Sequence, residues 1–200
     1  MTIVTNTSNR GMADKFKKLI FITSNPAKAK YLGDYFDVPF EHLNLDLPEI
    51  QSLDLRAIVE DKARRAFEIV KKPVLVEDIA LTFNALGKLP GPLIKWFFTS
   101  LGNEGLCRLL DPHKDKSAVA EVQFALADEG GIEIFSGLRE GSISERPKGE
   151  FNFGWDPIFI PDGFNKTWGE MTTHEKHETS IRKIALEKAK NYLINRAYES

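Results

Sequence analysis

Cysteine is nearly absent from this 200-residue sequence, which limits how the chain is stabilised. Cys107 is the one cysteine, so no disulfide bond forms within the chain. The apolar residues around Cys107 indicate a small buried side chain rather than a reactive thiol. We therefore expect a reducing compartment and place the protein in the cytoplasm.

Long hydrophobic runs and an excess of basic charge are also missing. Residues 1–17 are polar and lack the apolar stretch of a secretory signal or membrane anchor, so we expect a flexible tail there and one folded domain over residues 18–200. Lys and Arg number 27 against 29 Asp and Glu, a formal net charge of −2. Duplex binding requires a basic face, so neither nucleic acid nor a membrane is expected as a partner.

The sequence does contain alternating strand-like and helix-like patterns, which are typical of an α/β fold with a mixed sheet. Short apolar β-prone runs predict strands at residues 19–22, 40–45, 74–76, 119–127 and 132–138. Apolar residues at helical spacing predict helices at residues 26–36, 55–70, 93–101, 104–110 and onward from residue 180. The charged residues within the 55–70 helix are expected to face water.

The first predicted strand leads through a tight turn into the first predicted helix. Ser24 or Asn25 can cap this helix, and Pro26 then occupies its first position, where a missing N–H group has no cost. A helix that begins in this way presents backbone N–H groups to an anion, although most such turns bind nothing. The turn is therefore a candidate phosphate site.

Three acidic residues follow a predicted turn or strand: Glu49 comes after Pro48, and Glu77 and Asp78 come after the apolar strand at 74–76. Ligands of open α/β sheets usually bind at the carboxyl ends of the strands. Mg²⁺ prefers hard oxygen ligands, usually one or two carboxylates together with waters and substrate phosphates. The residues alone leave open a magnesium site, or carboxylates that cap a helix or pair with a lysine.

Basic and aromatic candidates also lie at loop ends. A phosphate can be held by lysine or clamped by arginine, and the candidates are Lys28, Lys95, Lys176 and Arg182, unless these are ordinary surface charges. Residues 151–157 place aromatic rings around a glycine in irregular backbone. Such rings stack on nucleobases, and a nearby Asp accepts from a base N–H group, but the same loop can instead plug the core.

Taken in order, these segments resemble the inosine triphosphate pyrophosphatase family, also called Ham1, over residues 19–193. Thr23-Ser24-Asn25 with Lys28 is similar to the family's T-G-N-x-x-K turn, and residues 47–51 are similar to its L-P-E-x-Q segment. Residues 74–78, 83–87, 89–92 and 94–97 resemble eukaryotic-type members at almost every position. Residues 153–157 match the F-G-W-D-P motif.

The resemblance implies an elongated two-lobed α/β domain with a long mixed β-sheet flanked by helices, an active-site cleft between the lobes, and a homodimer. It also implies hydrolysis of non-standard purine nucleoside triphosphates such as ITP, dITP and XTP to the monophosphate and pyrophosphate. The implied cofactor is Mg²⁺, or Mn²⁺ in its place.

The resemblance further implies a role for each candidate residue. Glu49, Glu77 and Asp78 would hold the metal ion and water, with Asp78 orienting or deprotonating the water that attacks the α-phosphorus. Phe153 and Trp155 would flank the base, and Asp156 would read its edge. Substrate binding is thus assigned to Thr23, Asn25, Lys28, Lys95, Phe153, Trp155, Asp156, Lys176, Ser180 and Arg182.

Three departures from the family pattern bear on this assignment. The usual S-H-R reads Ser180-Ile181-Arg182, and Ile181 cannot donate the hydrogen bond that the family histidine gives to the 6-oxo group. His177, four residues earlier, is expected to be an ordinary loop histidine. The usual Glu-Asp-Thr/Ser-Gly run continues as Ile79-Ala80, where alanine restricts positive φ, and Tyr31 replaces an acidic residue.

These departures motivate two alternatives to an active purine triphosphate pyrophosphatase. One is a pyrophosphatase with a shifted base preference, caused by Ile181. The other is a catalytically weakened homologue that binds nucleotides, caused by Tyr31, Ile79 and Ala80.

Overall fold

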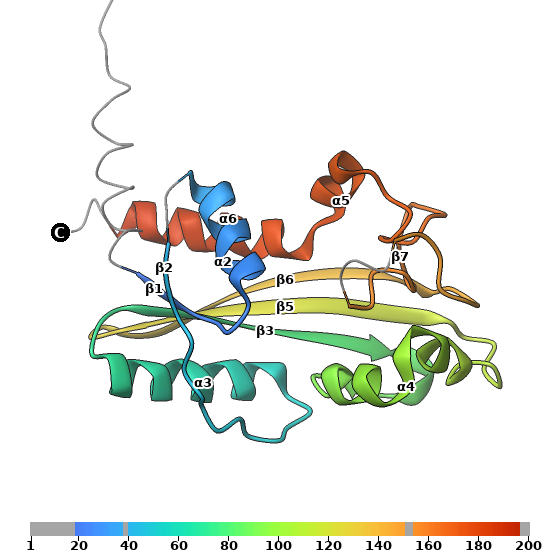
Figure 1. The fold of residues 1–200 in the computed structure, drawn as a ribbon, viewed down its shortest axis with the longest axis horizontal. Helices are drawn as coiled ribbons and strands as arrows, with labels where there is room; N and C mark the ends of the chain where they lie inside the picture. The colour runs from blue at the N-terminus through green and yellow to red at the C-terminus, as the bar shows by residue number, and fades with distance from the viewer. Residues whose placement is uncertain (1–18, 38–39, 151–153, 197–200) are drawn as a thin grey trace, which may run out of the picture.

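A long mixed β-sheet forms the centre of the molecule (Figure 1). The structure is a computed structural model that describes residues 19–37, 40–150 and 154–196. In these ranges seven strands lie in the order β2-β1-β3-β5-β6-β7, and β4 pairs with β3. The strands are β1 (Ile20–Ile22), β2 (Glu41–Leu43), β3 (Val74–Phe83), β4 (Pro90–Gly91), β5 (Ser117–Asp128), β6 (Gly131–Ile143) and β7 (Phe159–Pro161).

Helices cover both faces of the sheet. The described helices are α2 (Pro26–Phe36), α3 (Leu55–Val70), η1 (Asn84–Leu86), α4 (Ile94–Arg108), α5 (Thr173–Thr179) and α6 (Ile181–Asn195). Figure 1 shows α2 and α6 on one side of the long strands and α3 and α4 on the other. None of the helices in the described ranges is long and apolar enough to cross a membrane.

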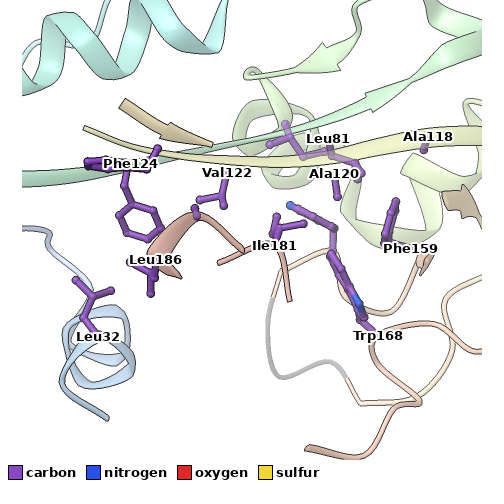
Figure 2. Close-up of a cluster of buried hydrophobic side chains, with 14 of the residues drawn as sticks. Leu32, Leu81, Ala118, Ala120, Val122, Phe124, Phe159, Trp168, Ile181 and Leu186 are labelled. Carbon is purple, nitrogen blue, oxygen red and sulfur yellow. The ribbon is translucent and has the colours of Figure 1, made fainter. Parts of the chain in front are cut away.

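Two buried clusters hold these layers together. The larger lies on the α2 and α6 side, and Figure 2 shows Leu32 of α2 and Leu186 of α6 beside Phe124 of β5. The smaller lies under α3 and includes Val74 and Val76 of β3. Successive side chains of a strand point to opposite faces, so even-numbered residues of β3 face α3 and odd-numbered residues face α6.

One edge of β3 is left without a strand partner over its middle. Its first residues, Val74 and Leu75, pair in parallel with β1, and Leu81 and Thr82 pair with β4. Residues 76–80 have no partner on that side among the described strands, because β1 ends at Ile22 and β4 comes only later along the strand. Side chains from both faces of β3 therefore reach a common opening at this gap.

The predicted α/β fold with a long mixed sheet flanked by helices is confirmed, with some different boundaries. β3 does not end at Val76 but continues through Glu77 and Asp78 to Phe83, so these acids lie within the strand. Ala80 takes no positive φ there, since the described non-glycine residues with positive φ are Asp37 and Lys71. The division between a tail at 1–17 and a domain from 18 stays a prediction, because residues 1–18 lie outside the described ranges.

Candidate functional site

A cleft of about 1290 Å³ opens beside the unpaired stretch of β3. Its walls come from the β1–α2 turn, the segment before α3, the start of α4 and the junction of α5 with α6. Twelve of the residues assigned to the site from sequence line it: Thr23, Asn25, Lys28, Glu49, Glu77, Asp78, Lys95, Trp155, Asp156, Lys176, Ser180 and Arg182. Phe153 lies outside the described residues, and the roles of all thirteen stay predictions.

The β1–α2 turn presents a helix N-terminus to this cleft. Asn25, not Ser24, caps α2, because its side chain accepts a hydrogen bond from the Ala27 N–H at 3.0 Å. Thr23 stabilises the turn by accepting from the Asn25 N–H at 3.1 Å. Backbone N–H groups in the first turn of a helix attract anions, so this wall suits a phosphate group.

Glu77 lies at the centre of a buried ion-pair network. Its side chain is 2% exposed, and it faces α6, where the Arg182 guanidinium donates to both carboxylate oxygens at 2.9 and 3.0 Å. The Lys28 ammonium contacts the same carboxylate at 2.9 Å. Burial alone would raise the pKa of Glu77, but the two cations outweigh it and hold that pKa at about 2. Glu77 is therefore ionised, and its carboxylate is paired with two cations of the protein itself.

On the other face of β3, a lysine that sequence analysis missed joins the two remaining acids. The Lys62 ammonium lies 2.7 Å from Glu49 and 3.6 Å from Asp78. Burial raises the pKa of Asp78 despite the opposing charge of Lys62. The pKa of Glu49 is lowered, because Lys62 outweighs the effect of its partial burial.

Lys62 corrects the expectation that every charged residue of the 55–70 helix faces water. Its side chain is only 18% exposed. A signal was present in the sequence, since position 62 lies four residues from both Ile58 and Ala66, on the apolar stripe of the helix. The acids at its ammonium group compensate for burying the charge.

These contacts bear on which carboxylates can bind a divalent metal ion. The described residues contain no group of three His, Cys, Asp or Glu side chains arranged as metal ligands, and the assignment of Glu49, Glu77 and Asp78 to a metal ion stays a prediction. The two-residue alternation of β3 points Glu77 and Asp78 to opposite faces. Glu49 and Asp78 instead converge on one cation, Lys62, and two carboxylates with waters and phosphates are enough for Mg²⁺.

The opposite end of the cleft is aromatic. Trp155 is 8% exposed and packs against Trp168 and Phe159, with ring centroids 5.5 and 6.0 Å away, and it also lines the cleft. Asp156 binds the Lys176 ammonium at 2.8 Å, and burial raises the pKa of this Asp although Lys176 opposes the shift. Trp168, which sequence analysis did not single out, also lines the cleft.

The junction of α5 and α6 closes this end. Ser180 caps α6 by accepting from the Lys183 N–H at 3.2 Å. Ile181 is 5% exposed and belongs to the buried cluster drawn in Figure 2. His177 is the fifth residue of α5 rather than a loop residue, and it too lines the cleft. Lys95 lies across the cleft in α4, with its ammonium 5.9 Å from the Trp96 ring centre.

Comparison with known proteins identifies relatives of this chain. Two named relatives are an inosine triphosphate pyrophosphatase 1 of Trypanosoma cruzi, 42% identical over 84% of this chain and 88% of that protein, and an inosine triphosphate pyrophosphatase of Ajellomyces capsulatus, 45% identical over 88% and 97%. Similar solved structures include a HAM1 protein from Coxiella burnetii, with a TM-score of 0.77 and 25% identity over 88% of this chain and 98% of that one.

A second solved structure supports the fold alone. The Staphylococcus aureus Ham1 protein is 20% identical, with a TM-score of 0.76 over 89% of this chain and 98% of that one. The model of the Ham1 family matches residues 19–192, nearly the whole range in which sequence motifs and cleft residues are found. This chain therefore belongs to the Ham1 family, and its predicted resemblance to inosine triphosphate pyrophosphatases is confirmed.

Proposed function

We propose that this chain is a nucleoside triphosphate pyrophosphohydrolase, which cleaves between the α- and β-phosphates and releases a nucleoside monophosphate and pyrophosphate. The observation that carries the proposal is the convergence of Glu49 and Asp78 on one cation, in the cleft that also holds the N-terminus of α2. Acidic ligands beside an anion site match the needs of a metal-bound triphosphate. The inosine triphosphate pyrophosphatase relatives support the same reaction class.

The chain's own residues supply binding, orientation and a proton acceptor. The first turn of α2 and Lys28 bind phosphate oxygens, and Lys95 approaches from the opposite wall. Asp78 accepts the proton of the attacking water. Mg²⁺ bound by Glu49 and Asp78 in place of the Lys62 ammonium would neutralise charge on the phosphates. Glu77 has a different part: it holds Arg182 and Lys28 in position.

The aromatic end of the cleft would receive a purine base. Trp155 and Trp168 supply apolar surface, and Asp156 with Lys176 supplies polar groups for the base edge. We propose ITP, dITP and XTP as substrates. The first alternative, a shifted base preference, is favoured by one observation: Ile181 presents no hydrogen-bond donor where the family histidine would.

Hydrolysis of a substrate panel tests the proposal. Pyrophosphate release from ITP, XTP, dUTP, ATP and GTP is measured with Mg²⁺ and again with Mn²⁺, and the kcat/KM values rank the bases. Asp78→Asn keeps the shape of the side chain but removes the proton acceptor, so kcat is expected to fall by about 10²–10⁴-fold. Tight nucleotide binding without product from the unmodified protein would instead identify the catalytically weakened homologue.

The homodimer is likewise a proposal, which sedimentation velocity tests directly. A particle of twice the chain mass at micromolar concentration is the expected result, and a particle of one chain mass would reject it.

A further inference from the structure

Tyr31 occupies a place in the cleft that the proposed reaction has not used. It lies in α2 one turn after Lys28, is half-buried, and lines the cleft. Its hydroxyl lies 3.2 Å from the hydroxyl of Ser180, at the N-terminus of α6. This contact joins two helices that are 149 residues apart in the sequence, at the end of the cleft where Ile181 contributes only apolar surface.

Counting protons shows what this hydroxyl pair can offer. Ser180 already accepts from the Lys183 N–H at 3.2 Å. The two hydroxyls carry one proton each, and their mutual hydrogen bond uses one of them, whichever atom donates. Among the contacts described for the pair, the second O–H is then left to donate into the cleft.

The charges around the pair favour an acceptor oxygen as its partner. Lys28 and Arg182 both contact the Glu77 carboxylate, and Lys28 lies one turn from Tyr31 while Arg182 lies two residues after Ser180. Ammonium and guanidinium groups only donate hydrogen bonds, so their presence beside the pair favours a carbonyl oxygen over an amino group. The O–H donor and the two cationic donors therefore select the same kind of group.

The position of Tyr31 favours the base over the phosphates. Three residues along a helix correspond to about 4.5 Å, so Tyr31 lies further from the N–H groups of the helix start than Lys28 does. The neighbouring walls are apolar or aromatic, from Ile181, Trp155 and Trp168, and such surface suits the faces of a ring system.

We infer that Tyr31 is a specificity-determining residue, whose hydroxyl accepts a hydrogen bond from the Ser180 O–H and donates its own proton to a ring carbonyl oxygen of the substrate's purine. The inference rests on the proposed function. It gives Tyr31 the hydrogen-bond donor role that Ile181 cannot fill. The departures from the family pattern at positions 31 and 181 then compensate for each other.

The test compares Tyr31→Phe with the unmodified protein on two substrates. ITP carries the ring carbonyl, and purine riboside triphosphate lacks it but keeps the ribose and phosphates. The expected result is a fall of about tenfold in kcat/KM for ITP, with purine riboside triphosphate unaffected. The matched control is Tyr35→Phe, which removes the same atom one turn further along α2, from a residue that does not line the cleft.

The other outcomes are distinguishable. An equal fall with both substrates would show that the hydroxyl only positions Ser180 and α6, or contacts the sugar or phosphates, and would overturn the inference. Unchanged kcat/KM for ITP would overturn it as well. In either case the proposed reaction stands. Failure of the unmodified protein to cleave any triphosphate would overturn the proposed function, and with it the inference.

Discussion

Glu77 is a buried carboxylate whose charge must be compensated by neighbouring side chains. A carboxylate that is 2% exposed is stable only because Arg182 and Lys28 compensate it. Glu77→Gln should therefore lower the free energy of unfolding by about 3–5 kcal/mol, since it leaves two cations without their anion. Urea unfolding of the two proteins at neutral pH measures this difference.

A matched control and the pH dependence make this prediction sharper. Glu60→Gln removes a carboxylate from an exposed pair with Arg64, and it should lower the free energy of unfolding by less than about 1 kcal/mol.

The folded-state pKa of Glu77 is lowered from 4.5 to about 2, so the stabilising effect of this carboxylate is complete above pH 4.5 and is lost as pH falls towards 2. The difference in unfolding free energy between Glu77→Gln and the unmodified protein should become smaller as pH falls over that range. A gap that does not change with pH would contradict the ion-pair explanation.

The residue types in the sequence predicted which residues line the cleft better than they predicted which of those residues form ion pairs with one another. All twelve described candidates line one cleft, because motifs at strand and helix ends meet at the same edge of the sheet. The separation of Glu77 from Asp78 was missed because the strand was expected to end before them, and the alternation of side chains was not applied beyond it. Lys62 was missed because a charge within a helix was assigned to solvent.

Among the elements, α6 depends on a close approach to β6. A Cβ atom added at Gly137 would lie 1.9 Å from the Ile181 carbonyl oxygen and 3.0 Å from the Ala185 nitrogen, and both of these are backbone atoms. Gly137→Ala must therefore push the first turn of α6 away from the sheet. We expect a loss of about 1–3 kcal/mol in unfolding free energy, as in other overpacked cores.

The same shift should reach the site, because that turn carries Arg182. Gly137→Ala is expected to lower kcat/KM as well as stability, whereas Ser136→Ala, on the opposite face of β6, should change neither by much. Unfolding curves and initial rates on ITP measure both effects. Normal activity in a destabilised Gly137→Ala protein would show that α6 can move without displacing the guanidinium.

Two helices were predicted with their full bounds, and two short elements were missed. The helices at 26–36 and 55–70 have the predicted bounds, since their apolar spacing and flanking caps agree. The break between the helices at 93–101 and 104–110 corresponds to Gly102, which has φ 63° inside α4. β7 and α5, of three and seven residues, were not predicted, because so short a segment carries too little periodic signal.

At the scale of the molecule, the site exists because the sheet is interrupted. β1 and β4 leave the middle of one edge of β3 uncovered, and the cleft opens at that gap between α2 and α6 on one face and α3 and α4 on the other. No local pattern shows such a gap, because it depends on the register of three strands. The Ham1 resemblance predicted a cleft between lobes, while the structure gives its physical origin.

A cleft of this kind should couple nucleotide binding to the stability of the whole fold. In the proposed binding mode, a non-hydrolysable ITP analogue with Mg²⁺ would contact groups from both faces of the sheet, so it should bind only the folded chain. At a concentration of 100 times its Kd, it stabilises the fold by about 2.7 kcal/mol. For a domain of this size that corresponds to a rise of about 5–10 °C in Tm, which differential scanning calorimetry measures. Chelation of Mg²⁺ with EDTA should remove most of this rise, because Glu49 and Asp78 would then face the phosphates without a metal ion between them. A rise that is the same with and without EDTA would show that the nucleotide binds away from these two carboxylates.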